Sequence, residues 1–201
     1  MKPLWQVPLF RRKNQDDEKT ETPAPPRIQT AKNSGARALP RPAMRWLGPQ
    51  GNVALRPFDF DADADAVCEF QNETYTLNFP DFHYDGAFST AFRHDLRRAA
   101  LDGQHGLFVL DENRPIGFIW LVICQNTWTN ERYGYVNNLS ILGERRGQGL
   151  GREMMRQADD FFRSRGVRVA RLSVTVANRA ACALYADSGY TTERWEMEKK
   201  L

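Results

Sequence analysis

A crowded glycine stretch, "RRGQGLGREMM" at residues 145–155, constrains the fold of this chain more than any other feature. Gly147, Gly149 and Gly151 fall within five positions, although glycine costs about 0.5–1 kcal/mol wherever regular structure must form. An apolar run precedes the stretch and apolar residues at helical spacing follow it, which predicts a tight turn between a strand and a helix. Because a helix N-terminus leaves N–H groups without intrahelical partners, such a turn binds phosphate readily. It is therefore either an anion-binding loop or a ligand-free connection.

Two familiar phosphate-binding patterns do not fit this stretch. The P-loop requires a Lys-Ser/Thr pair after its last glycine, and none follows here. The dinucleotide fingerprint is GxGxxG, whereas these glycines are spaced GxGxG. A nucleotide-binding protein of either type is thus a distant alternative.

Charge is distributed unevenly along the 201 residues. The whole chain carries +3 and residues 1–50 carry +6, so residues 51–201 carry −3. The basic first part has neither a dense basic run nor interleaved aromatic residues, which argues against nucleic-acid binding. No apolar run approaches the roughly 20 residues that span a bilayer, so no membrane association is expected.

The cysteines and histidines predict neither a disulfide framework nor a metal site. The three cysteines are far apart and form no CxxC motif, and the three histidines lack ligand spacing. This usage suits a reducing compartment, which favours the cytoplasm.

Composition divides the chain into two parts. Residues 1–48 are predicted to be a disordered, basic, Pro-rich N-terminal extension, because residues 14–42 offer almost nothing to bury. The apolar start "PLWQVPLF" could dock on the domain or on a partner protein. Residues 52–201 are predicted to form one domain, and nothing in the sequence decides whether it is a monomer or a homodimer.

Alternating helical and strand patterns predict an α/β fold in the broad sense, which includes α+β. The sheet is expected to be mixed and mostly antiparallel, with helices on both faces. Strands are predicted over residues 52–60, 105–110, 116–125, 133–142, 168–176 and 191–201, and helices over 61–77, 88–101, 150–165 and 178–188.

Two motifs in this order resemble the GCN5-related N-acetyltransferase (GNAT) family. They are "LSILGERRGQGLGREMM" and "NRAACALYADSGY". The family's [R/Q]xxGx[G/A] pattern is matched by Arg146, Gly149 and Gly151. Its later NxxAxxLYxxxGF pattern is matched by Asn178, Ala181, Leu184, Tyr185 and Gly189, with Tyr190 in place of Phe. The resemblance covers residues 52–201, and the short C-terminal end departs from the longer hairpin of many members.

The resemblance implies that acetyl-CoA is bound as the acetyl donor. The pyrophosphate would lie on Arg146, Gly147, Gln148, Gly149, Gly151 and Arg152, mostly on their backbone amides. Gly151 would also let the following helix pack closely on the sheet. The backbones of Leu139 and Ile141 would hold the pantetheine arm and thioester, beside a strand bulge expected at Asn137–Asn138. Asn178 would contact the arm, cap the last helix, or do both.

The resemblance also implies a catalytic role for Tyr185, as the general acid that protonates the departing thiolate; a packed helix tyrosine is the alternative. Several family members carry a catalytic glutamate where this chain has Tyr135, so the base is open. Glu131 and a water chain through Asn137 are the two candidates.

The function expected from these residues is transfer of an acetyl group from acetyl-CoA to a primary amine of a small molecule or a protein. A non-catalytic acyl-CoA-binding regulatory module of the same fold is the alternative. The acceptor would enter between the aromatic, acidic segments at 76–86 and 126–132, which suit a cationic amine. Their aromatic residues could equally be packing the loops onto the domain.

Overall fold

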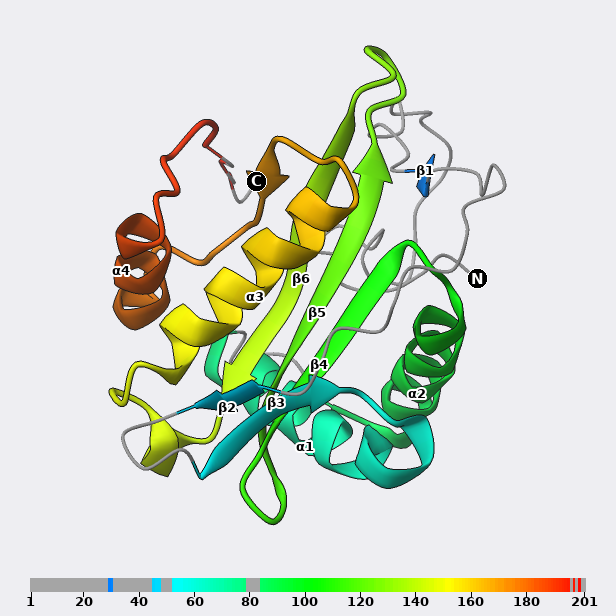
Figure 1. Cartoon of the computed structure of the whole chain (residues 1–201), viewed down its shortest axis with the longest axis vertical. Coiled ribbons are helices and arrows are strands. Elements are labelled where there is room, and N and C mark those ends of the chain that lie inside the picture. The colour runs from blue at the N-terminus through cyan, green and yellow to red at the C-terminus, as the bar shows by residue number, and fades with distance from the viewer. Residues whose placement is uncertain are drawn as a thin grey trace.

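The computed structural model of this chain describes residues 29–30, 45–47, 52–78, 84–195, 197 and 199. Within these ranges one sheet has the strand order β2–β3–β4–β5–β6–β7, and β1 pairs with the end of β5 (Figure 1). The strands are β1 (Gln29–Thr30), β2 (Arg45–Leu47), β3 (Val53–Pro57), β4 (His105–Asp111), β5 (Pro115–Gln125), β6 (Arg132–Ile141) and β7 (Ala170–Arg171). The helices are α1 (Phe60–Asn78), α2 (Gly86–Leu101), α3 (Leu150–Ser164) and α4 (Arg179–Asp187), with a 3-10 turn, η2, at Gly143–Arg145.

The sheet is mixed, and its two faces are covered by different helices. Every strand pair is antiparallel except β6–β7, which is parallel. In Figure 1, α3 crosses one face with α4 beside it, and α1 and α2 lie against the other. Along β5, Ile119 and Leu121 face the α3 side, whereas Trp120 faces α1 and α2. The predicted fold class is therefore confirmed, and β5 is apolar throughout because both of its faces are buried.

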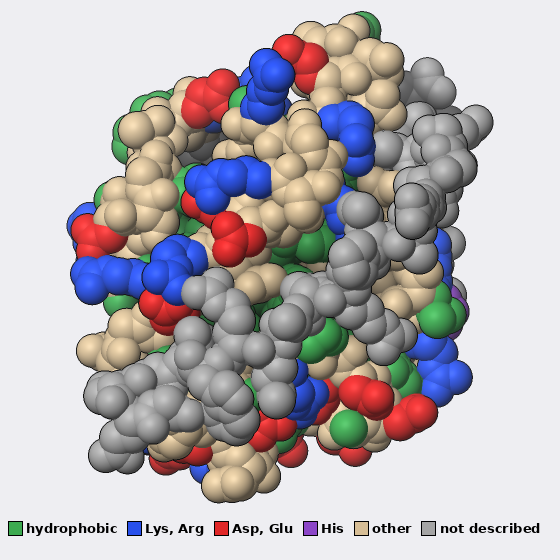
Figure 2. Space-filling model, viewed as in Figure 1, with side chains coloured by type: hydrophobic (Ala, Val, Ile, Leu, Met, Phe, Trp, Pro, Cys, Tyr) green, Lys and Arg blue, Asp and Glu red, His purple; other side chains and the backbone are tan. Residues whose placement is uncertain are grey.

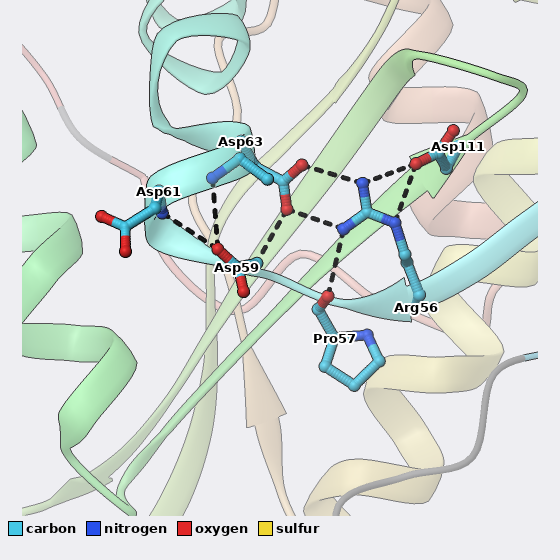
Figure 3. A network of polar contacts seen from close by, with 7 residues as sticks. Arg56, Pro57, Asp59, Asp61, Asp63 and Asp111 are labelled. Carbon is cyan, nitrogen blue, oxygen red and sulfur yellow. Dashed lines mark hydrogen bonds and ion pairs between the residues drawn. The ribbon is translucent and has the colours of Figure 1, made fainter.

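Arg56 ties three elements together at one edge of the sheet. Its guanidinium lies 2.7 and 2.8 Å from the carboxylate oxygens of Asp63 on α1 and 2.5 Å from Asp111 at the end of β4 (Figure 3). Asp63 is only 1% exposed. Hydrogen bonding to Asp63 raises the pKa of Arg56, so the arginine stays charged. Asp59 begins α1 by accepting hydrogen bonds from the N–H groups of the first turn.

Two predicted strands near the C-terminus are corrected by the structure. The strand expected over residues 168–176 is reduced to Ala170–Arg171, and described residues 191–195 of the expected final strand are irregular. After Arg171 the chain no longer lies beside β6, so the alternating pattern has no partner strand to pack against. Val174 and Val176 are accordingly 37% and 58% exposed. Alternation therefore predicted that a strand is present here but not its length.

Two short strands fall inside the segment predicted to be a disordered extension. β2 pairs with β3, with Trp46 opposite Ala54, and β1 pairs with β5, with Gln29 opposite Gln125. Most of residues 1–48 lie outside the described residues. The boundary near residue 52 and the disorder before it stay predictions.

Candidate active site

A bulge in β6 opens the sheet. Trp120 on β5 pairs with Asn138 and the next residue, Leu121, pairs with Val136, so Asn137 is the extra residue. The bulge predicted at Asn137–Asn138 is confirmed. On its other side β6 pairs with β7 only at Gly134 and Tyr135. Within the described part of the chain, β6 beyond the bulge has a strand on one side and an open edge on the other.

Polar side chains fill the α1 side of this opening. Asn138 donates a hydrogen bond of 2.8 Å to Gln71, which is buried on α1. Asn137 donates to Asn138 at 2.6 Å. On the opposite face Leu139 and Ile141 pack into the apolar cluster beneath α3. Along the open edge of β6, the side chains at and beyond the bulge therefore form a polar face toward α1 and an apolar face toward α3.

The glycine turn that follows β6 has the backbone geometry of an anion cradle. Gly147 and Gly149 have φ of 76° and 81°, and a side chain on either would meet no protein atom within 4 Å. Glycine is needed there for its backbone conformation, and the space outside the turn is open. Gly149 is the N-cap residue of α3 and provides no side-chain cap. The first N–H groups of α3 therefore point into open space with a positive helix dipole behind them.

Gly151 serves a different purpose from the other two glycines. A Cβ there would lie 3.0 Å from a methyl group of Leu184 on α4 and 3.7 Å from Ile141 of the sheet. The close packing predicted against the sheet is thus chiefly packing of α3 against α4. Both motifs are brought together at this contact.

Each arginine of the turn is paired with an acid from a distant element. Arg146 also donates from Nε to the carbonyl of Ile141 at 2.8 Å. Because these charges are already matched, an anion in the turn would be held first by backbone N–H groups. The pairs are Arg145 with Glu112 at 2.5 Å, Arg146 with Glu73 at 2.8 Å and Arg152 with Asp187 at 2.8 Å.

Asn178 caps α4, as one of the two predicted roles requires. Its side-chain oxygen accepts a hydrogen bond of 3.2 Å from the N–H of Ala181. The cap fixes the start of the helix that carries Tyr185. A contact between Asn178 and a cofactor arm stays a prediction.

Tyr185 lies in the apolar cluster on the α3 side of the sheet, with its ring centroid 6.1 Å from that of Tyr190. Burial, together with smaller contributions from the neighbouring Cys182 and Tyr135, raises its pKa to about 12. Its hydroxyl is therefore protonated at neutral pH and is available as a hydrogen-bond donor.

Tyr135 bridges the strands where they begin to separate. Its hydroxyl lies 3.2 Å from Oγ of Ser173, two residues beyond the end of β7. Tyr135 is also the last residue of β6 that pairs with β7. This contact closes the inner end of the opening.

Glu131 lies apart from this group. It is exposed, immediately before β6, and its carboxylate accepts a hydrogen bond from Thr129 at 3.2 Å. Four residues along a strand separate it from Tyr135, or about 13 Å. Of the predicted acceptor loop, residues 79–83 lie outside the described residues. Asp85 is the N-cap residue of α2 and accepts from the N–H of Phe88.

The described part of the chain offers no other obvious functional centre. None of its helices has the length and apolar character that a membrane span needs, and it holds no group of three potential metal ligands. On the face shown in Figure 2, basic and acidic side chains are interspersed rather than gathered into one patch.

Known proteins share both the sequence pattern and this fold. Residues 64–190 match the sequence model of the acetyltransferase (GNAT) family. The chain belongs to the GNAT family. A mycothiol acetyltransferase of Amycolatopsis mediterranei is 31% identical over 161 residues, which are 76% of this chain and 52% of that protein. The chain thus spans about half the length of the curated relatives it matches.

Solved GNAT structures agree with the fold. A GCN5-related N-acetyltransferase from Ralstonia eutropha superimposes with a TM-score of 0.59 at 25% identity, over 74% of this chain and 98% of that one. An acetyltransferase from Clostridium acetobutylicum, described with acetyl-CoA, gives a TM-score of 0.62 at 15% identity, over 74% and 96% of the two chains. The second likeness concerns the fold alone.

Sequence reasoning missed the partners of the site residues. Ser173 meets Tyr135 across the opening, and Glu73 and Asp187 hold two arginines of the glycine turn. Ser173 and Glu73 belong to neither motif, Asp187 is a position of the second motif that its pattern leaves unspecified, and each partner lies 35 or more residues away along the chain. No local pattern could have found them.

Proposed function

We propose that this GNAT chain is an acetyl-CoA-dependent N-acetyltransferase whose acceptor is a primary amine. The observation that carries the proposal is the open edge of β6. It leads from the uncapped N-terminus of α3, past Leu139 and Ile141, to Tyr135, one of the groups that raise the pKa of Tyr185. The proposed phosphate site, the unpaired strand edge and the proposed proton donor would thus follow one another along the donor.

The donor would be bound mainly by backbone groups. Its pyrophosphate would lie on the N–H groups of Gly147 to Arg152, because the turn is open outside the glycines. Its amide-containing arm would add to β6 as an extra strand. One lone pair of the Ile141 carbonyl is already used by Arg146, so Leu139 offers the freer backbone. The acetyl group would then lie near Tyr135 and Tyr185.

The reaction moves one proton and one acyl group. The amine nitrogen attacks the thioester carbon, a C–N bond forms, the C–S bond breaks, and a proton leaves nitrogen while another reaches sulfur. A phenol with a pKa of about 12 is a weaker acid than a thiol near 8.5, so full proton transfer from Tyr185 would cost about 5 kcal/mol. Tyr185 therefore donates a hydrogen bond to the departing sulfur and passes its proton on as it receives one from the ammonium nitrogen.

Two candidates for the base that first deprotonates the amine are Glu131 and a water chain through Asn137. Glu131 is about 13 Å along the strand from Tyr135, so it can act only through intervening water molecules. Asn137, the bulge residue two positions beyond Tyr135, is the other candidate, since its side chain offers hydrogen bonds to a chain of water molecules. An α-amine with a pKa near 8 needs little help at neutral pH, whereas a lysine near 10.4 needs much more.

The relatives named mycothiol acetyltransferases support acetyl transfer as the reaction class. Because this chain spans about half of their length, we leave the acceptor as a primary amine of a small molecule or a protein. The cytoplasm is the proposed location, since the free cysteines suit a reducing compartment.

The test measures thiol release from acetyl-CoA with and without a panel of amines. The panel holds an amino acid, a polyamine, a lysine peptide and a peptide with a free N-terminus. Amine-dependent thiol release with matching acetylated product is the expected result. Tight acetyl-CoA binding without amine-dependent release for any amine would favour the regulatory module.

A further inference from the structure

We infer that Tyr135, held by Ser173, forms the end wall of the acyl pocket and restricts the donor to a short acyl group such as acetyl. The inference rests on the proposed function, because it takes acyl-CoA to bind along the open edge of β6. It adds a residue that sets donor specificity, which neither motif of the sequence contains.

The sheet itself fixes where the acyl end of the donor stops. An arm that starts at the glycine turn runs along β6 toward the point where β7 joins it. β7 pairs with β6 at Gly134 and Tyr135, and paired strands lie about 4.8 Å apart. No third chain fits between strands at that spacing. The acyl group must therefore end next to Tyr135.

The Tyr135 side chain is anchored on two sides at this end. Its ring packs against the apolar cluster under α1 and α2, and its hydroxyl contacts Ser173 at 3.2 Å. The contact spans from β6 to the segment after β7, across the direction in which a longer acyl chain would grow. Ring and hydroxyl together therefore close the pocket.

Arg171 pairs with Tyr135 in the β6–β7 ladder, but its side chain contacts other residues. Its guanidinium lies 4.7 Å from the ring centre of Tyr133 and 4.0 Å from the carboxylate of Glu193. These two contacts turn the Arg171 side chain toward the paired part of the strands. Tyr135 is therefore the side chain that the acyl group would contact at this end of the pocket.

The experiment compares acetyl-CoA, propionyl-CoA and butyryl-CoA on the wild-type chain and on Tyr135→Ala. Affinities are measured by calorimetry without acceptor, and kcat/KM is measured with the best amine of the panel. The wild type should prefer acetyl-CoA. The butyryl-to-acetyl ratio should rise by about tenfold in Tyr135→Ala, the factor expected when two methylene groups gain a buried site.

Phe60→Ala is the matched control, because Phe60 packs against the same apolar cluster as Tyr135 but is the first residue of α1 and takes no part in the β6–β7 pairs. It should leave the butyryl-to-acetyl ratio unchanged. If Tyr135→Ala does not fold, Tyr135→Leu, which keeps an apolar contact with the cluster, should raise the ratio in the same direction.

Three results would overturn the inference. They are a wild type that accepts butyryl-CoA as well as acetyl-CoA, a folded Tyr135 variant with an unchanged ratio, and an equal rise in the Phe60 control. The calorimetric arm needs no turnover. If the chain binds acyl-CoA with the predicted selectivity but transfers no acyl group, the proposed enzymatic function is refuted and the inference about Tyr135 stands.

Discussion

The guanidinium of Arg146 lies 2.8 Å from the carboxylate of Glu73, and this ion pair joins the glycine turn to a helix 73 residues earlier in the chain. A phosphate entering the turn must compete with that carboxylate for the arginine. Both partners are partly exposed, with 49% and 38% of their side chains accessible. The pair is therefore weak enough to exchange when the donor binds.

Glu73→Gln should strengthen CoA binding by roughly twofold to fivefold at low salt, because the competing charge is removed from an exposed pair. Calorimetric titration with CoA measures the change. Asp159→Asn is the control, since Asp159 pairs with Arg163 at the far end of α3, and it should leave the affinity unchanged. Weaker binding in Glu73→Gln would show that the carboxylate holds Arg146 in its binding position.

Gly149→Val should abolish CoA binding. Saturating CoA at 100 times its dissociation constant should stabilise the wild type by about 2.7 kcal/mol, and the thermal shift of the variant should vanish. Gly166 is a matched control because it also has a positive φ, 70°, and no protein atom near a virtual Cβ, but it lies just beyond the C-terminus of α3. Gly166→Val should carry a similar backbone strain, about 1–3 kcal/mol, and keep the CoA shift. A CoA shift that persists in Gly149→Val would remove the turn from the binding site, and loss of the shift in both variants would attribute the loss to backbone strain.

Tyr185→Phe should lower kcat by about 10²-fold with little change in the KM of the amine, because the hydroxyl acts in the transition state. Tyr190→Phe is the control. Its hydroxyl is buried without a hydrogen-bond partner among the described residues, so its removal should leave turnover unchanged and should not destabilise the domain. Full turnover in Tyr185→Phe with every amine would reduce Tyr185 to a packing residue.

Arg56→Ala should destabilise the domain by about 3–5 kcal/mol, because it leaves the carboxylate of Asp63 buried without its partner. Urea unfolding measures the loss. Arg114→Ala removes an exposed ion pair, to Glu144 at 3.1 Å, and should cost less than about 1 kcal/mol. Equal losses would show that the Arg56 network contributes no more than a surface pair.

Alkaline pH should destabilise the domain. Burial raises the pKa of Tyr133, Tyr185 and Tyr190 to about 12, and that of Cys124 also to about 12. In the unfolded chain these groups ionise near 10 for tyrosine and near 8.5 for cysteine. The folded state then binds more protons, so its stability falls from about pH 9 to pH 12. Melting temperatures measured across that range should decline, and less so in Tyr185→Phe; a flat profile would contradict the assigned burial.

Local patterns predicted most of the fold. The 3.6-residue periodicity placed α3, and two apolar runs around a polar turn placed the β4–β5 hairpin. Alternation, which predicted the strand over residues 168–176, failed after Arg171, because it records which faces are apolar and not whether a partner strand is present. β7 ends at Arg171, whose partner Tyr135 lies two residues before Asn137, the extra residue of the β6 bulge.

The candidate site was predicted only as far as its backbone elements. Gly147 and Gly149 could be placed in a tight turn between a strand and a helix, and the structure adds their positive φ angles of 76° and 81°. Glu73 and Ser173 could not, since a tertiary contact leaves no trace in the residues next to it. In the sequence, Tyr135 was noted because several family members carry a catalytic glutamate at its position. The structure adds the contact of its hydroxyl with Ser173.

The extra residue at Asn137 is an insertion that leaves the faces of β6 unchanged. Before the bulge, Val136 faces the α3 side; after it, Asn138 faces α1 and Leu139 faces α3. Val136 and Asn138 thus face opposite sides, as direct neighbours in a regular strand do, and their partners Leu121 and Trp120 are direct neighbours on β5. Deletion of Asn137 would therefore close the bulge and keep every later side chain of β6 on its present face. A single-codon deletion there would spare the core and alter only the open edge along which the donor is proposed to bind.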